Sequence, residues 1–212
     1  MVNSKNRTLV FSIIGLIFFI CFVFLSYLVH KNYFTKLDFN NTVHLQNHIP
    51  RRLDGFFSAL SYIGELQIAI IFLLIILAIY RKWRGIIVLL VFLFFHVFEL
   101  YGKVFVDHKP PPEFMLRTQI PSNLPQFYVS TQNSYPSGHA ARAFFITLIL
   151  GYLISKSSKL PKISKIAIYF LLSIYDILMI TSRVYLGEHW TSDVIGGALL
   201  GLSMALFSIG LL

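Results

Sequence analysis

The sequence predicts an all-α polytopic membrane protein, a bundle of six transmembrane helices with an extracytoplasmic loop region that carries a functional site. Three observations lead to this fold class. Hydrophobic residues make up 56% of the 212 residues and charged residues only 13%, far from the composition of an ordinary soluble domain. Mean hydropathy is +0.71, and several apolar stretches reach the roughly 20 residues that a spanning helix needs. Residues 1–212 are best described as a single domain, since no internal repeat divides them.

The N-terminal half contains three of the predicted spans. The first runs from Leu9 to Val29 and is too long for the apolar region of a signal peptide, so we expect a retained helix. Residues 30–55 are polar with interspersed apolar side chains, which is typical of a helix lying at the membrane interface. The second and third spans are predicted over residues 56–80 and 85–102.

The C-terminal half begins with the longest loop, residues 104–135, which is punctuated by prolines. Loops of this length are often functional. Three more spans are predicted after the loop, over residues 136–154, 166–181 and 191–212. In the last span, Gly197 and Gly201 have a spacing that permits close contact between helices.

The cations lie at the ends of apolar segments, where an excess of Lys and Arg sets membrane orientation. Six spans place three cationic groups on one side: Lys5 with Arg7, residues 81–84, and the lysines between 156 and 165. We therefore expect a multi-pass protein of the cytoplasmic membrane with both termini cytoplasmic. Residues 103–139 and 183–193 then share the extracytoplasmic face. The net charge of +9 does not indicate a nucleic-acid partner, because no basic stripe interleaved with aromatic residues is present.

Two short polar runs on that face hold the residues of a candidate site. Residues 181–193 contain Arg183, His189 and Asp193, and the last two are four apart, hence on one face of a helix that begins there. A carboxylate beside an imidazole fixes its tautomer and supports a developing imidazolium, and Arg suits a phosphate or carboxylate. The other run ends in His139. Taken alone, a histidine at a helix end is more often an interfacial residue than a catalyst, and a Lys or Arg at a membrane boundary usually extends its charged group to the interface. Several ionisable groups gathered at membrane depth, however, favour a functional site.

The two runs resemble the second and third signature motifs of the type 2 phosphatidic acid phosphatase (PAP2) superfamily, which includes bacterial lipid phosphatases, undecaprenyl-pyrophosphate phosphatases and soluble vanadium haloperoxidases. The matching segments are Pro136-Ser137-Gly138-His139 and Ser182-Arg183-x5-His189-x3-Asp193. The resemblance extends over about residues 102–197, and the six-helix layout is similar to that of the membrane branch.

The resemblance implies a mechanism without a metal or other cofactor. In it His189 attacks phosphorus to form a phosphohistidine, and Asp193 orients the other ring nitrogen. His139 protonates the leaving oxygen and then deprotonates water. The equatorial oxygens are held by four further groups: Lys103, Ser137, the backbone N–H of Gly138, and Arg183. The start of the helix that follows Pro136 adds its dipole and free N–H groups.

The first family motif is irregular in this chain. The pattern is a Lys, six residues and then Arg-Pro, whereas Lys103 is followed by five residues and then Lys109-Pro110. Lys109, Arg117 and Arg142 are the candidates for the missing cation. We expect Arg142 to contribute, because it lies one helical turn after His139. The alternative is that Arg142 pairs with Asp176 or Glu99 inside the bundle.

The resemblance implies a hydrolase acting on a lipid phosphate or pyrophosphate substrate within the membrane. Undecaprenyl pyrophosphate, phosphatidate and phosphatidylglycerol phosphate are the candidate substrates, and the sequence does not separate them. A phosphotransferase using the same site is the nearest alternative, and a non-catalytic lipid-phosphate binder or small transporter is another. The paired His and carboxylate speak against the binder, since binding alone needs only cations.

Overall fold

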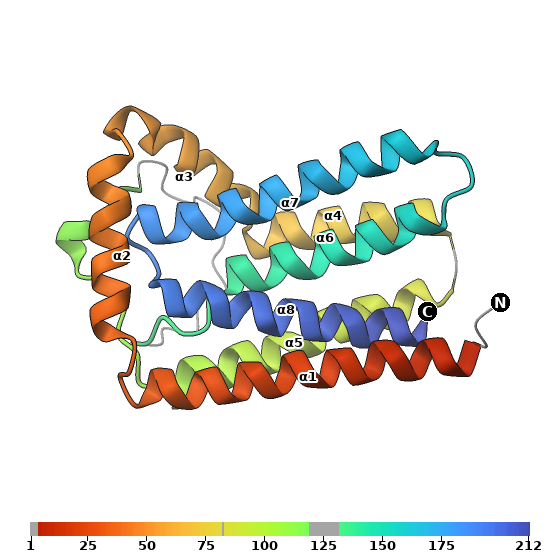
Figure 1. Cartoon of the computed structure of the whole chain (residues 1–212), viewed down its shortest axis with the longest axis horizontal. Helices are drawn as coiled ribbons and strands as arrows, with labels where there is room; N and C mark the ends of the chain where they lie inside the picture. The colour runs from red at the N-terminus through yellow and green to blue at the C-terminus, as the bar shows by residue number, and fades with distance from the viewer. Residues whose placement is uncertain (1–3, 82, 119–131) are drawn as a thin grey trace.

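The protein folds into a bundle of long helices with one helix lying across its end (Figure 1). The structure is a computed structural model that describes residues 4–81, 83–118 and 132–212. Part of the long predicted loop, residues 119–131, and one of the orienting cations, Lys82, lie outside the described residues. The described residues form helices and no strand: α1 (Ser4–His30), α2 (Thr35–His48), the 3-10 turn η1 (Arg51–Leu53), α3 (Asp54–Ile63), α4 (Leu66–Tyr80), α5 (Gly85–Phe105), the 3-10 turn η2 (Glu113–Met115), α6 (Gly138–Lys156), α7 (Lys162–Tyr185) and α8 (Thr191–Leu211).

The predicted spans are confirmed with one correction. Among the described residues, five helices are long and apolar enough to cross a membrane, and a sixth span results if the bent pair α3 and α4 counts as one. The prediction of one continuous helix over residues 56–80 is wrong, because the chain bends by 56° between Ile63 and Leu66. The apolar pattern continues through this break, so composition alone does not reveal it.

The break between α3 and α4 is held by contacts with α6 and α7. Its carbonyl at Gly64 accepts a hydrogen bond from Nε of Arg142 at 2.9 Å. A Cβ atom on Gly64 would lie 2.8 Å from the ring of His139 and 3.0 Å from Met179. The broken backbone is therefore packed directly against the His139 ring, and Gly64 is required by that approach.

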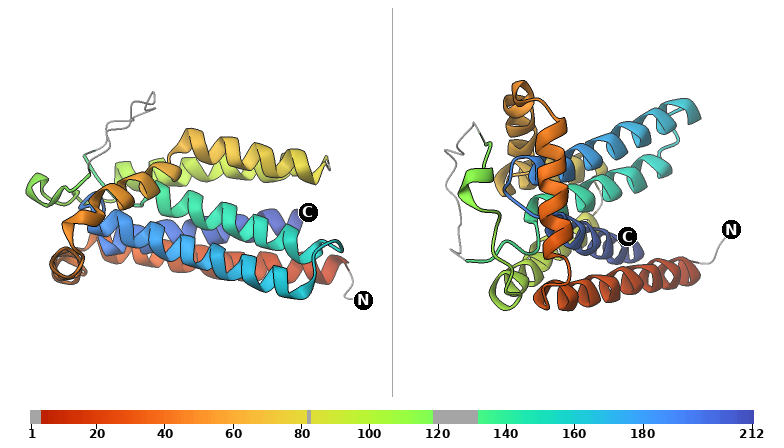
Figure 2. Two further views of the ribbon diagram at one scale, coloured as in Figure 1. Left: turned by 90° about the horizontal axis from the view of Figure 1, so that it is seen from above. Right: turned by 60° about the vertical axis from the view of Figure 1, so that its left-hand side comes forward.

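The helix expected within residues 30–55 is confirmed as α2. It lies across the end of the bundle, roughly perpendicular to the long helices, in all three views (Figures 1 and 2). Polar side chains fasten it there: Asp38 accepts hydrogen bonds from the backbone N–H and the hydroxyl of Ser192 at 2.8 and 2.6 Å, and Gln46 donates to the carbonyl of Tyr185 at 2.9 Å. In this way α2 holds the C-terminus of α7 and the N-terminus of α8 together.

Helix α8 occupies the centre of the bundle and packs closely on α6. A Cβ atom on Gly197 would lie 2.2 Å from the carbonyl oxygen of Ser137, and one on Gly201 equally close to that of Ala141. The predicted close contact through these glycines is thus confirmed. The large exposed apolar side chains lie mainly on α1, α4, α5 and α7, as expected for helices that face lipid.

The two ends of the bundle carry different parts of the chain. Both chain termini lie at one end, and α2 lies across the other (Figure 1). The C-terminal ends of α5 and α7 and the N-terminal ends of α6 and α8 meet beneath α2, and these are the ends that carry the predicted site residues. Arg183, predicted in a polar break, lies in the last turn of α7.

Candidate active site

A cavity of about 810 Å³ lies among the helix ends beneath α2. Six of the residues that the sequence suggested for the site line it: Lys103, Gly138, His139, Arg142, Arg183 and His189. They come from α5, α6, α7 and the turn before α8, so residues far apart in the sequence meet in one hollow. Asp193 and Ser137 lie directly behind this lining, fully buried.

The turn between α7 and α8 brings His189 back over Arg183. The backbone N–H groups of Glu188 and His189 both donate to the carbonyl of Arg183, at 3.1 and 3.2 Å. Gly187 has φ +70°, and a Cβ atom there would lie 2.3 Å from the carbonyl oxygen of Met115. Only glycine fits this left-handed and crowded position. The conformation of this turn therefore fixes the position of the His189 imidazole.

Asp193 fixes the tautomer of His189. The Nδ1–H group of His189 donates to Oδ2 of Asp193 at 3.3 Å, and the same oxygen accepts from the backbone N–H of Trp190 at 3.0 Å. Because Nδ1 carries the proton, the lone pair of the neutral ring is on Nε2. Burial lowers the pKa of His189 and the charges of Arg183 and Lys103 lower it further, whereas the hydrogen bond that His189 donates to Asp193 raises it. The ring is thus neutral near pH 7 and suited to nucleophilic attack.

His139 lies in the first turn of α6. Its Nε2 is buried and has no hydrogen-bond partner among the described residues, and it lies 4.0 Å from Oε1 of Glu65. The two signature motifs are joined behind it, since the N–H of Ser137 donates to the carbonyl of Asp193 at 3.0 Å. A Cβ atom on Gly138 would lie 2.1 Å from Oε1 of Glu99 and 2.7 Å from Arg142. The packing of these two side chains therefore requires a glycine at position 138.

The cations differ in how strongly protein groups hold them. Arg183 contacts the hydroxyl of Ser61 and pairs with Glu188. Arg142 lies 3.5 Å from Glu99 and donates to Gly64, so the pairing with Glu99 that the sequence left open is present. Asp176, the other partner considered, instead accepts from Thr147 at 2.8 Å.

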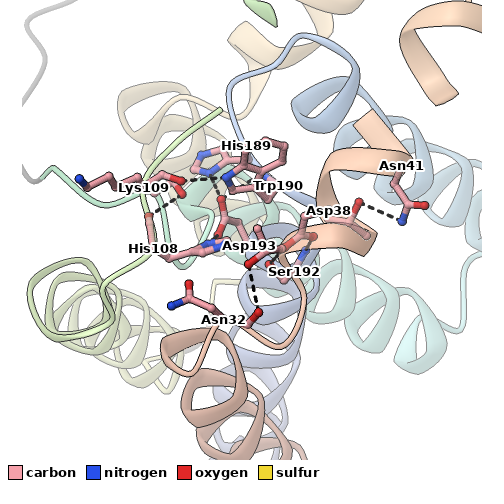
Figure 3. A network of polar contacts seen from close by, with 12 residues as sticks. Asn32, Asp38, Asn41, His108, Lys109, His189, Trp190, Ser192 and Asp193 are labelled. Atoms are coloured by element: carbon pink, nitrogen blue, oxygen red, sulfur yellow. Dashed lines mark hydrogen bonds and ion pairs between the residues drawn. The ribbon is translucent and has the colours of Figure 1, made fainter. Parts of the chain in front are cut away.

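Lys109 and Arg117 do not lie with the other cations. Lys109 is absent from the cavity lining; its side chain extends away from Asp193, and its carbonyl accepts from the indole N–H of Trp190 at 2.8 Å (Figure 3). The guanidinium of Arg117 lies over the ring of Tyr185, 5.1 Å from its centroid. The segment that corresponds to the first family motif, residues 103–110, therefore does not bring a second cation beside Lys103.

Two residues of the site were not predicted. His108, directly before Lys109, donates from Nδ1 to Oδ1 of Asp193 at 2.8 Å, and its Nε2 lies 3.7 Å from Asp38 (Figure 3). Both side chains are buried. The sequence holds one faint signal for His108, its place in the irregular first motif, and none for Asp38, which lies 155 positions before Asp193.

The fold and the site together define a membrane member of a known group of proteins. Residues 84–211 match the PAP2 superfamily. Since this match covers more than half of the chain, the chain belongs to the PAP2 superfamily.

Two curated relatives resemble part of the chain. It is 33% identical over 124 residues to phosphatidylglycerophosphatase B of Bacillus subtilis (strain 168), an alignment that covers 58% of this chain and 56% of that protein. It is 31% identical over 120 residues to probable lipid phosphate phosphatase 4 of Arabidopsis thaliana, over 47% of this chain and 38% of that protein. The chain thus spans about half the length of these relatives or less.

Two solved structures share the fold. The transmembrane PAP2-type phosphatidylglycerolphosphate phosphatase of Bacillus subtilis has a TM-score of 0.72 and 24% identity, over 91% of this chain and 92% of that chain. Aquifex aeolicus LpxE has a TM-score of 0.61 and 26% identity, over 81% and 94%. The architecture of the helix bundle is therefore that of membrane PAP2 proteins.

Proposed function

We propose that the protein is an integral membrane phosphatase that hydrolyses a lipid phosphate or lipid pyrophosphate through a phosphohistidine intermediate. One observation carries this proposal: the carboxylate-bound His189, and His139, whose Nε2 has no hydrogen-bond partner among the described residues, line one cavity with Lys103 and Arg183. A nucleophile, a proton-transfer group and two cations are what transfer of a phosphoryl group requires.

In the proposed mechanism Nε2 of His189 attacks phosphorus in line. The bond between phosphorus and the lipid oxygen breaks, and His139 gives its proton to that oxygen. Water then gives a proton to His139 and attacks the phosphohistidine, which releases phosphate and restores His189. Lys103 and Arg183 balance the charge that grows on the equatorial oxygens. Ser137 and the N–H groups that begin α6 complete the proposed phosphate site, and Arg142 contributes from the cavity lining.

The rest of the cavity supports a lipid as the substrate. Its lining continues along α4 and α5 with four apolar side chains: Leu66, Ile70, Leu93 and Leu100. An acyl or prenyl chain bound there would remain in contact with the hydrocarbon region of the bilayer. A water-soluble phosphate would gain nothing from this surface.

Polar groups within the same part of the cavity favour a glycerophospholipid phosphate over a polyprenyl pyrophosphate. His96 and Gln67 also line it. The Nδ1–H of His96 donates to the carbonyl of Phe92 at 2.8 Å, and its Nε2, 3.8 Å from Glu99, has no hydrogen-bond partner among the described residues. Phosphatidate and phosphatidylglycerol phosphate carry ester or hydroxyl oxygens below the phosphate, whereas a prenyl chain offers no such group. Burying polar side chains against a prenyl chain costs free energy.

We further propose that the site lies on the extracytoplasmic face of the cytoplasmic membrane. The support is the separation of the site from both termini, which lie at the opposite end of the bundle (Figure 1). The lysines at 156–165 lie at the end of α6, in the turn that follows and at the start of α7, at the termini's end of the bundle, and this excess of cations supports a cytoplasmic position for that end.

Release of phosphate from a panel of lipids by the purified protein tests the proposed function. The panel contains phosphatidylglycerol phosphate, phosphatidate, undecaprenyl pyrophosphate and, as a soluble control, glycerol 3-phosphate. We expect turnover of the first two, slower turnover of the third and none of the last. Binding of lipids without phosphate release would identify a binder, and transfer of phosphate to an added alcohol would identify a transferase.

The variant His96→Leu tests the preference for glycerophospholipids. Loss of one hydrogen bond to the lipid should lower kcat/KM for phosphatidylglycerol phosphate by about tenfold, and leave the value for undecaprenyl pyrophosphate unchanged. An equal effect on both substrates would contradict the proposed preference.

A further inference from the structure

The carboxylate of Asp193 is shared by two histidines. His189 donates to Oδ2 at 3.3 Å and His108 donates to Oδ1 at 2.8 Å (Figure 3). His108 does not line the cavity, and Asp193 is fully buried. His108 therefore cannot meet the substrate directly, and it reaches the nucleophile only through Asp193.

His108 is held in this position by its backbone and by a second carboxylate. Its carbonyl accepts from the N–H of Ser134 at 2.8 Å and from the hydroxyl of the same residue at 3.0 Å. This ties the irregular first motif to the segment that leads into His139. On the other side, Nε2 lies 3.7 Å from Asp38, which itself caps α8 through Ser192. The imidazole is thus enclosed between carboxylates from α2 and α8.

The surroundings of the two histidines favour opposite charge states. Burial alone would lower the pKa of His108, but the hydrogen bond to Asp193 and the charges of Asp193, Asp38 and Asp107 raise it. Burial lowers the pKa of His189, and Arg183 and Lys103 add to that effect against Asp193. His108 is therefore protonated more readily than His189, although both histidines share the Asp193 carboxylate. Two titratable groups whose surroundings shift their pKa values in opposite directions often have different roles in catalysis.

We propose that His108 is a positioning residue for catalysis: it orients the Asp193 carboxylate toward His189 through the 2.8 Å hydrogen bond and, when protonated, offsets the negative charge of Asp193 that would otherwise favour protonation of the nucleophile. This inference rests on the proposed function of His189. It also accounts for the irregular first motif, whose residues in this chain supply a hydrogen-bond donor to Asp193 where the family pattern has a phosphate-binding arginine.

Three substitutions of His108 separate its two nitrogens. His108→Asn keeps an N–H donor at the place of Nδ1, toward Asp193. His108→Gln keeps one at the place of Nε2, toward Asp38, and His108→Ala keeps neither. His48→Ala is the matched control, since His48 is an exposed histidine of α2. For each purified protein we would measure kcat, KM, the pH dependence of kcat/KM and the midpoint of thermal unfolding.

We expect kcat to fall by about 10- to 150-fold in His108→Ala and His108→Gln, the effect of losing a hydrogen bond to a charged group. KM should change little, and His108→Asn should recover most of the rate. All three variants lose the imidazolium, so the pKa of His189 should rise and the acid limb of kcat/KM should move to higher pH. His48→Ala should behave as the wild type.

Three results would overturn the inference: wild-type kcat and pH profiles in all variants, equal losses that follow equal losses of thermal stability, or better recovery by His108→Gln than by His108→Asn. His189→Ala is measured alongside, and turnover by that variant would refute the proposed function itself. Failure of the proposal for His108 is recognised separately, by an inactive His189→Ala together with unaffected His108 variants.

Discussion

Arg142 is the cation for which structure and sequence suggest different roles. Its guanidinium lies 3.5 Å from Glu99, with side chains 8% and 12% exposed, and it donates to Gly64 at the break between α3 and α4. It also lines the cavity beside His139. Replacing it by Met keeps most of the volume while removing the charge and both contacts. The effect on stability and the effect on rate then report on two different interactions.

The stability loss can be worked out from these contacts. Leaving a buried carboxylate without its partner costs about 3–5 kcal/mol, and Glu99 keeps a weak contact with His96 at 3.8 Å, which favours the lower end. The carbonyl of Gly64 loses its donor at a further cost of about 1 kcal/mol. Arg142→Met should therefore lose about 4 kcal/mol, or about 8–16 °C in Tm for a chain of this size.

The double variant Glu99→Gln/Arg142→Met separates the structural role from the chemical one. Without the carboxylate, no charge is left unpaired, so most of the Tm should return. The rate should not return if Arg142 also holds the phosphate, since a lost charged contact to a transition state costs about 10²–10³ in kcat. The single variant Glu99→Gln completes the cycle.

Thermal unfolding in detergent and phosphate release from a lipid phosphate are the two assays. A Tm for Arg142→Met within a few degrees of the wild type would refute the pairing with Glu99. Recovery of the full rate by the double variant would show that Arg142 acts on the site only by neutralising Glu99. A slow, stable double variant is the expected result.

Four further predictions concern the proposed chemistry and orientation. His189→Ala should abolish turnover without unfolding the protein, and rapid mixing with labelled substrate should trap acid-labile phosphate on the wild type alone; label on the variant would reassign the nucleophile. Chelation with EDTA should leave the rate nearly unchanged while vanadate inhibits, and a loss restored by a divalent ion would contradict phosphate binding by Lys and Arg. Because the pKa of His189 lies below its ordinary value of 6.5, kcat/KM should be constant near neutrality and fall only below pH 6.5, as the nucleophile becomes protonated; a fall already complete at pH 7 would contradict this. In a Cys21→Ser background, a cysteine at Asn47 should react with an impermeant thiol reagent on intact cells and one at Ser158 only after permeabilisation, and the opposite pattern would place the site on the cytoplasmic face.

Local sequence was enough to predict most of the spans and the hydrogen-bonded pair His189 and Asp193. Apolar length predicts each transmembrane helix because the bilayer imposes a nearly constant span. The four-residue spacing of His189 and Asp193 predicts their hydrogen bond because His189 lies in the turn directly before α8 and Asp193 lies in its first turn. The glycine spacing in α8 likewise predicts the close packing on α6. In each case the sequence pattern that predicts the feature spans only a few residues or follows from the thickness of the membrane.

Only the tertiary structure decided which residues from different elements meet. The break at Gly64 lies inside an uninterrupted apolar pattern, and it is stabilised by Arg142 and by the His139 ring, 75 positions or more away. The choice of Glu99 over Asp176 as the partner of Arg142 depends on how α5 and α6 pack. His108 and Asp38 join Asp193 because α2 lies across the end of the bundle, and no local pattern encodes that placement. Sequence periodicity specifies which residues share one helix, whereas the contacts between helices depend on packing over the whole bundle.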